Sequence, residues 1–111
     1  PAAEGVIKME TQAKKNETEG RLARIDAMEA NWDKICGLLA ELPSSETVID
    51  LLKSLDSPYL PAQIDVDDGM LKNTFLYCKE VRSRYTILQM LWDLGVLEPL
   101  AEQVISELPR V

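Results

Sequence analysis

Residues 21–43 read RLARIDAMEANWDKICGLLAELP, and this stretch decides the fold class of the chain. Its apolar side chains recur at intervals of three and four residues, which places them on one face of an α-helix. They are Leu22, Ile25, Met28, Trp32, Ile35, Cys36, Leu39 and Leu42. Pro43 ends the pattern because proline cannot donate the next backbone hydrogen bond. The spacing therefore predicts one long amphipathic helix over residues 21–42.

Two further helices are predicted between Pro43 and Val81. Ser44 or Ser45 is a suitable N-cap for a helix that buries Val48 and Leu55. A loop with two prolines follows, and Asp65 is then expected to cap a helix that continues to Val81.

The last two helices follow a break at residues 82–84. Gly95 is expected to end the first of them in the left-handed conformation, and Pro109 ends the second. No stretch alternates apolar and polar residues as a strand would. The sequence therefore predicts an all-α fold of about five helices, arranged as a bundle-like domain.

The chain is expected to divide into two parts. Residues 1–20 mix lysine and glutamate with few apolar anchors, which is typical of an N-terminal tail or a solvated helix. Glu10 with Lys14, and Glu17 with Arg21, have the four-residue spacing that supports a helix. Residues 21–111 form the helical domain.

The net charge and hydropathy of the chain disfavour two classes of partner, nucleic acids and membranes. The net charge of −7 disfavours binding to nucleic acid or to an anionic membrane, since both require a surplus of basic residues. No apolar stretch approaches the roughly 18 residues of a membrane span, and no signal peptide is evident. We therefore expect a cytoplasmic protein. Cys36 and Cys78 are expected to be buried free thiols, because neither lies in a disulfide or zinc motif.

A basic cluster precedes the fourth predicted helix. Lys79, Arg82 and Arg84 could bind a phosphate or carboxylate beside the free N–H groups of a helix start. The more common role of such arginines is to pair with carboxylates, and Glu80 and Asp93 are close in sequence. Arg82 and Arg84 are thus candidates either for a substrate cleft or for a structural role.

Other candidate sites have simpler explanations. Asp65, Asp67 and Asp68 lack the later ligands of a calcium loop, so helix capping accounts for them better. The side chains of Trp32, Met90 and Trp92 could line a pocket, but at helical spacing they are more often core residues. Thr86 is expected to cap the helix that follows it.

The chain contains no histidine, which removes the commonest acid–base group at neutral pH and the commonest transition-metal ligand. No catalytic, cofactor-binding or metal-binding residue can be assigned. The chain alone is therefore not expected to be an enzyme.

Residues 21–104 nevertheless resemble a known family. The pattern includes Arg21-Leu22, Asn31-Trp32-Asp33, Leu42-Pro43, Pro58, Pro61 and Ile64-Asp65. It is densest in the run KEVRSRYTIL at residues 79–88 and in DLGVL at residues 93–97. This pattern resembles the C-terminal helical part of glycerol-1-phosphate dehydrogenases and their AraM-like relatives, in the iron-containing alcohol dehydrogenase and dehydroquinate-synthase-like superfamily.

The resemblance implies a parent oxidoreductase of phospholipid metabolism. Such enzymes reduce dihydroxyacetone phosphate with NADH or NADPH to sn-glycerol 1-phosphate. A divalent metal, zinc or nickel, is held by one aspartate and two histidines between the domains, and an N-terminal domain binds the nucleotide. None of these ligands can be placed in this chain, so the resemblance implies a non-catalytic fragment whose partner is the missing N-terminal domain.

Two functional hypotheses remain. The chain is either the helical domain of such a dehydrogenase or a freestanding helical module for protein interaction or homo-oligomerisation.

Overall fold

Seven α-helices lie within residues 2–109, the part of the chain that the computed structural model describes. They are α1 (Ala2–Ala13), α2 (Thr18–Ala30), α3 (Trp32–Ala40), α4 (Ser45–Ser54), α5 (Asp68–Tyr77), α6 (Ile87–Asp93) and α7 (Leu97–Glu107). Short 3-10 turns at Pro61–Ile64 and Cys78–Glu80 flank α5, and these described residues include no strand. The all-α class expected from the sequence is confirmed.

The helix predicted over residues 21–42 is divided in two at Asn31. The side-chain amide of Asn31 donates to the carbonyl of Ala27 at 2.9 Å, and its φ and ψ of −123° and 19° lie outside the helical region. Asparagine allows this because its short side chain competes with the backbone for local hydrogen bonds. The expectation of one continuous helix was wrong at this point. Together with α1, this division raises the number of helices above five.

Three of the expected helix ends are confirmed. Ser44 Oγ accepts from the N–H of Thr47 at 3.2 Å at the start of α4, and Thr86 Oγ1 accepts from Gln89 N–H at 3.4 Å at the start of α6. Gly95 ends α6 with φ of 74°, a conformation that costs least for glycine. Ser44 and Thr86 therefore determine where α4 and α6 begin, and Gly95 determines where α6 ends.

Asp67, not Asp65, caps α5. The carboxylate of Asp67 accepts from Met70 N–H at 2.7 Å, whereas Asp65 ends the preceding 3-10 turn with a left-handed φ of 57°. The expected cap was wrong because the turn at Pro61–Ile64 extends the loop. Capping nevertheless accounts for the acidic group, as expected.

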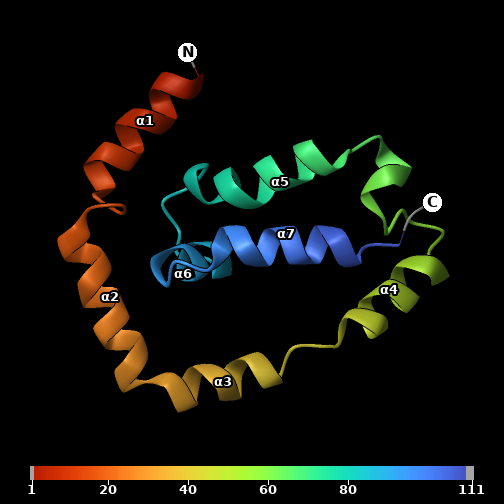
Figure 1. Ribbon diagram of the computed structural model, residues 1–111, viewed down its shortest axis with the longest axis horizontal. Helices are drawn as coiled ribbons and strands as arrows, with labels where there is room; N and C mark the ends of the chain where they lie inside the picture. Colours follow the sequence, from red (N-terminus) through yellow and green to blue (C-terminus); the bar gives the residue numbers. More distant parts are fainter. Residues whose placement is uncertain (1, 110–111) are drawn as a thin grey trace.

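The helices form a packed group and an outer arc (Figure 1). In the packed group, α5 and α7 lie side by side in opposite directions, and α6 packs at one end of α7. The helices α1 to α4 follow one another around the outside, and α2 contacts α6. The buried apolar side chains are Met28 on α2, Met90 on α6, and Leu97, Ala101 and Ile105 on α7.

The chain is more open than most domains of its length. Its radius of gyration is 16.4 Å, against about 13 Å for a typical domain of this size. Its accessible surface of 8396 Å² exceeds the roughly 6,200 Å² of an ordinary monomer of 12.5 kDa. Much apolar surface therefore remains uncovered on the chain.

Several residues expected to be buried are exposed as a consequence. The side chain of Trp32 is 47% exposed, and both Cys36 and Cys78 are exposed free thiols. The two thiols are unpaired as expected, but their predicted burial was wrong. The apolar stripe predicted to be buried over residues 21–42 is therefore exposed at Leu22, Trp32, Leu39 and Leu42.

None of the described helices combines the length and the apolar character needed to cross a membrane.

Candidate functional site

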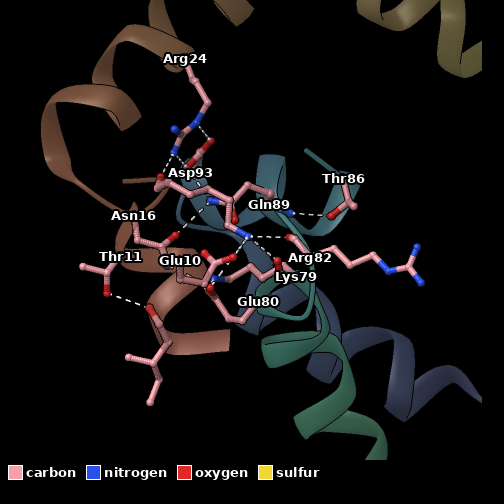
Figure 2. A network of polar contacts seen from close by, with 12 residues as sticks. Glu10, Thr11, Asn16, Arg24, Lys79, Glu80, Arg82, Thr86, Gln89 and Asp93 are labelled. Atoms are coloured by element: carbon pink, nitrogen blue, oxygen red, sulfur yellow. Dashed lines mark hydrogen bonds and ion pairs between the residues drawn. The ribbon is translucent and has the colours of Figure 1, made fainter. Parts of the chain in front are cut away.

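The main concentration of buried polar groups surrounds Asp93, whose side chain is fully buried at the end of α6. Arg24 on α2 donates from Nε to Asp93 Oδ2 at 2.7 Å and from Nη2 to Oδ1 at 2.8 Å. Tyr85 donates its hydroxyl to Oδ2 at 2.9 Å, and Gln89 donates its side-chain amide to Oδ1 at 3.2 Å. We call these four residues the Asp93 cluster, and Figure 2 shows three of them, Arg24, Gln89 and Asp93.

The charges of the Asp93 cluster stabilise one another. Burial opposes the ionisation of Asp93, but hydrogen bonds from Arg24, Tyr85 and Gln89 outweigh it and hold the pKa of the carboxyl below its usual value. The same bond to Asp93 raises the pKa of Arg24. Burial and the bond to Asp93 together raise the pKa of Tyr85 to about 12. At neutral pH the cluster therefore holds an ion pair and a neutral phenol.

Arg21 joins the same region to the backbone of α6. Its Nε donates to the carbonyl of Asp93 at 2.8 Å, and its guanidinium lies 5.0 Å from the centre of the Trp92 ring. The ammonium of Lys79 lies 4.6 Å from the centre of the same ring. Cations attract the electron-rich face of an indole, so Trp92 helps to bind the turn that contains Lys79 to α2.

Lys15 forms a second buried group between α1 and the turn after α5. Its ammonium donates to the carboxylate of Glu10 at 3.1 Å, to the carbonyl of Arg82 at 3.2 Å and to the carbonyl of Lys79. The side chain of Lys15 is 7% exposed, so the expectation of a solvated N-terminal segment was wrong here. One amine therefore satisfies backbone groups of a turn 64 residues further along the chain.

Glu80 is bound between two elements in the same way. It pairs with the neighbouring Lys79 and accepts two hydrogen bonds of 3.1 Å from the side-chain amide of Asn16. Burial disfavours its charge, but the bonds from Lys79 and Asn16 outweigh burial and lower the pKa of Glu80. This group and the Asp93 cluster adjoin each other, since Asn16 Oδ1 accepts from Gln89 at 3.4 Å (Figure 2).

The structure separates the three residues of the predicted basic cluster. Lys79 is buried and pairs with Glu80, which agrees with the structural alternative for that residue. Arg82 and Arg84 are exposed, and neither guanidinium forms an ion pair with a carboxylate of residues 2–109. In Figure 2 the side chain of Arg82 extends away from the polar groups that surround its own carbonyl. Arg82 and Arg84 therefore remain available to a partner or ligand.

Sequence inspection missed the residues that form the Asp93 cluster. Arg24 lies outside the apolar stripe of residues 21–42, and Asp93 was considered only as a carboxylate close in sequence to the basic cluster. One signal was present, because Asp93 lies between Trp92 and Leu94 in an apolar run and Gln89 precedes it by one helical turn. The position of Asp93 within this apolar run predicts that its carboxylate is buried, but it does not identify the cation that pairs with it.

The hollows near these groups do not favour a particular ligand. One of about 520 Å³ adjoins Trp92 and is lined by Arg21, Lys79, Glu80 and Glu98 among others. Two cations and two carboxylates leave this hollow without a charge that would select an anion. Another hollow, of about 480 Å³, lies between the turn at Pro61–Ile64 and the start of α5. None of the residues of the Asp93 cluster lines it.

The residues present do not fit a catalytic metal. The sequence has no histidine, and residues 2–109 hold no group of three or more cysteine, aspartate or glutamate side chains placed to bind one. Asp93 is already paired with Arg24. The chemistry of the buried groups is therefore that of ion pairing and hydrogen bonding.

No protein-family model, curated protein or solved structure matches this chain.

Proposed function

We propose that the chain is the helical C-terminal domain of an enzyme similar to the glycerol-1-phosphate dehydrogenases, and that its role there is architectural. The observation that carries this proposal is the contact between separate parts of the family-like pattern. Arg21 donates to the carbonyl of Asp93, and Tyr85 donates to its carboxylate. Residues of a pattern that stabilise one another across helices are expected where that pattern supports the fold and has no reaction of its own.

The proposed parent reduces dihydroxyacetone phosphate with NADH or NADPH in the cytoplasm. Its N-terminal domain would bind the nucleotide, and the metal, zinc or nickel, would be bound by residues outside this chain.

In the parent, Arg82 and Arg84 are the residues of this chain best suited to face the substrate. Both are exposed, and a phosphate ester is a ligand to which arginine can donate two hydrogen bonds at once. Tyr85 follows directly and is held by Asp93 at 2.9 Å, so the segment that carries both arginines is fixed at one end. A fixed segment positions a cation more accurately than a free loop does.

The alternative is a freestanding helical module for protein interaction. The observation in its favour is the large exposed apolar surface on the outer arc of helices. Both hypotheses account for that surface, since a parent domain and a separate partner would each cover it. They differ in whether a nucleotide-binding segment is encoded together with this chain.

The reading frame that encodes the chain provides the test. We expect it to continue upstream into a nucleotide-binding domain with metal-ligand histidines. Its complete product, supplied with zinc or nickel, should oxidise NADH or NADPH only when dihydroxyacetone phosphate is present. A reading frame without such a domain, or a product inactive with both nucleotides and both metals, would reject the dehydrogenase proposal in favour of the interaction module.

A further inference from the structure

The N-terminal segment, residues 2–16, is joined to the rest of the fold mainly by polar side chains. Its helix α1 has no buried residue and belongs to none of the well-packed helix pairs of residues 2–109. In contrast, α7 buries Leu97, Ala101 and Ile105 and packs against α5 and α6. Figure 1 shows α1 at the free end of the outer arc. Apolar burial therefore contributes much less to the position of α1 than to that of α7.

Lys15 and Asn16 fasten this segment to the turn after α5. The ammonium of Lys15 donates to two backbone carbonyls of residues 79–82, and the side-chain amide of Asn16 donates twice to Glu80 at 3.1 Å. Glu10 on α1 accepts from the same ammonium at 3.1 Å. The helix α1 is thus tied to a distant turn through one buried amine.

This attachment depends on the charges of two glutamates. Lys15 and Lys79 are only 7% and 5% exposed. Glu10 lies 3.1 Å from the Lys15 ammonium, and Glu80 pairs with Lys79 and lies 3.9 Å from Lys15 (Figure 2). At neutral pH two buried cations therefore face two carboxylates. Protonation of both carboxyls leaves the cations buried without a counter-charge, which is strongly unfavourable.

The other ionisable side chains near Glu80 do not replace the lost charge. Arg21, Tyr77 and Glu98 line the hollow of about 520 Å³ that adjoins it. Arg21 adds positive charge, Tyr77 is neutral in acid, and Glu98 pairs with Lys72 at 2.9 Å. Acid therefore removes the balance of charge at this point of the fold.

We propose that residues 2–16 form a strap that acid releases, because protonation of Glu10 and Glu80 detaches it while the packed helices remain folded. The pKa of Glu80 is lowered in the fold, so the attachment is complete above the ordinary carboxyl pKa and is lost as pH falls through the lowered value. An isolated helix of 12 residues is marginal in water, so α1 should unwind once released. This inference does not depend on the proposed dehydrogenase.

Release of the strap opens the hollow beside Trp92. Asn16 and Trp92 line this hollow together, and Asn16 also accepts from Gln89 at 3.4 Å. Gln89 is fully buried, and its Oε1 has no hydrogen-bond partner within residues 2–109. Asp93, which Gln89 also contacts, stays paired with Arg24 on α2. The departure of Asn16 therefore gives water access to Gln89 and to one side of Trp92.

Native-state hydrogen exchange between pH 7 and about pH 4 tests the proposal. Protection factors are compared, since they correct for the pH dependence of chemical exchange itself. Those of the α1 amides should fall at least about tenfold on acidification, because two buried cations lose their counter-charges. The amides of α7 should remain protected at the pH at which α1 has lost its protection.

The double variant Glu10→Gln/Glu80→Gln imitates the protonated strap at neutral pH. Its α1 protection at pH 7 should already be as low as that of the wild type in acid, with no further fall on acidification. Glu29→Gln/Glu41→Gln is the matched control, because it removes two carboxylate charges from exposed side chains outside the strap. The control should show the wild-type protection at pH 7 and the wild-type loss in acid.

Trp92 fluorescence gives a second measurement on chains with both native glutamates. In the Trp32→Phe chain Trp92 is the single tryptophan, and its quenching by acrylamide should increase as α1 loses protection. The proposal would be overturned by α1 protection that does not change in acid, by loss of α1 and α7 protection at the same pH, or by unchanged quenching of Trp92.

Discussion

The guanidinium of Arg24 binds both carboxylate oxygens of Asp93, at 2.7 and 2.8 Å, across 69 residues of sequence. This pair joins α2 on the outer arc to the end of α6 in the packed group. Planar bidentate pairing is the strongest form of this contact, because two parallel hydrogen bonds fix distance and orientation together. This ion pair therefore helps to position the arc, together with the contacts of Arg21 and Lys15.

Replacement of Arg24 by methionine should destabilise the fold severely. Met keeps much of the apolar stem but leaves the Asp93 carboxylate buried without a cation, which costs about 3–5 kcal/mol. Urea denaturation followed by circular dichroism measures the loss. Arg82→Met is the control, because the Arg82 guanidinium has no ion pair within residues 2–109, and its effect should stay within about 0.5 kcal/mol. Equal effects of the two variants would show that the pair does not support the fold.

The fold should lose stability in acid. The folded-state pKa values of Asp93 and Glu80 both lie below their ordinary values, so the unfolded chain binds more protons than the folded chain as pH falls. Their contribution is present above the ordinary carboxyl pKa of about 4 and is lost as pH falls through the folded-state values. Denaturation midpoints measured at successive pH values test this. Asp93→Asn should be less stable at pH 7 but should lose less on acidification, and a parallel pH profile would contradict the assignment.

Tyr85 should titrate later than an ordinary tyrosine. Its pKa is raised to about 12 by burial and by the hydrogen bond to Asp93, against about 10 for a free phenol. Because the folded state holds the proton more tightly, stability should decline as pH rises from about 10 towards 12. The difference in phenolate absorbance between the wild type and Tyr85→Phe isolates this group. If the difference appeared already near pH 10, the hydrogen bond from Tyr85 to Asp93 would be ruled out.

The loss of the Lys15 ammonium should loosen the turn between α5 and α6. Lys15→Met removes the donor to the carbonyls of Lys79 and Arg82, and unsatisfied backbone groups of this kind cost about 2 kcal/mol together. Hydrogen exchange of amides at residues 79–86 should become faster. Lys14→Met is the neighbouring control, since the Lys14 side chain is 71% exposed, and exchange in that variant should be unchanged.

Arg84→Ala separates a structural role from a role at a substrate cleft. Its guanidinium is exposed and has no ion pair within residues 2–109, so stability should change by no more than about 0.5 kcal/mol. In the complete dehydrogenase that we propose, the same change should raise the KM for dihydroxyacetone phosphate, with Arg82→Ala as the companion variant. Unchanged kinetics in both variants would remove these arginines from the substrate cleft.

Local features of the fold were predictable because their causes lie within a few residues. The cap at Ser44, the cap at Thr86 and the left-handed Gly95 each follow from the residue type and its immediate neighbours. The break at Asn31 was missed although it is also local, since apolar spacing continues across it and gave no sign of interruption. The Asp93 cluster was missed for a different reason, because Arg24 and Asp93 meet only after α2 and α6 have packed.

The sequence by itself determined the helical class, several helix ends and the apolar face of each helix, because short-range hydrogen bonding and periodicity control these features. Only the tertiary structure decided which of those faces are covered. It buries Lys15 and Asp93 through partners distant in the chain, and it leaves Leu38 and Leu51 exposed. Burial depends on what lies opposite a side chain in space, and the spacing of residues along one helix contains no information about that opposite surface.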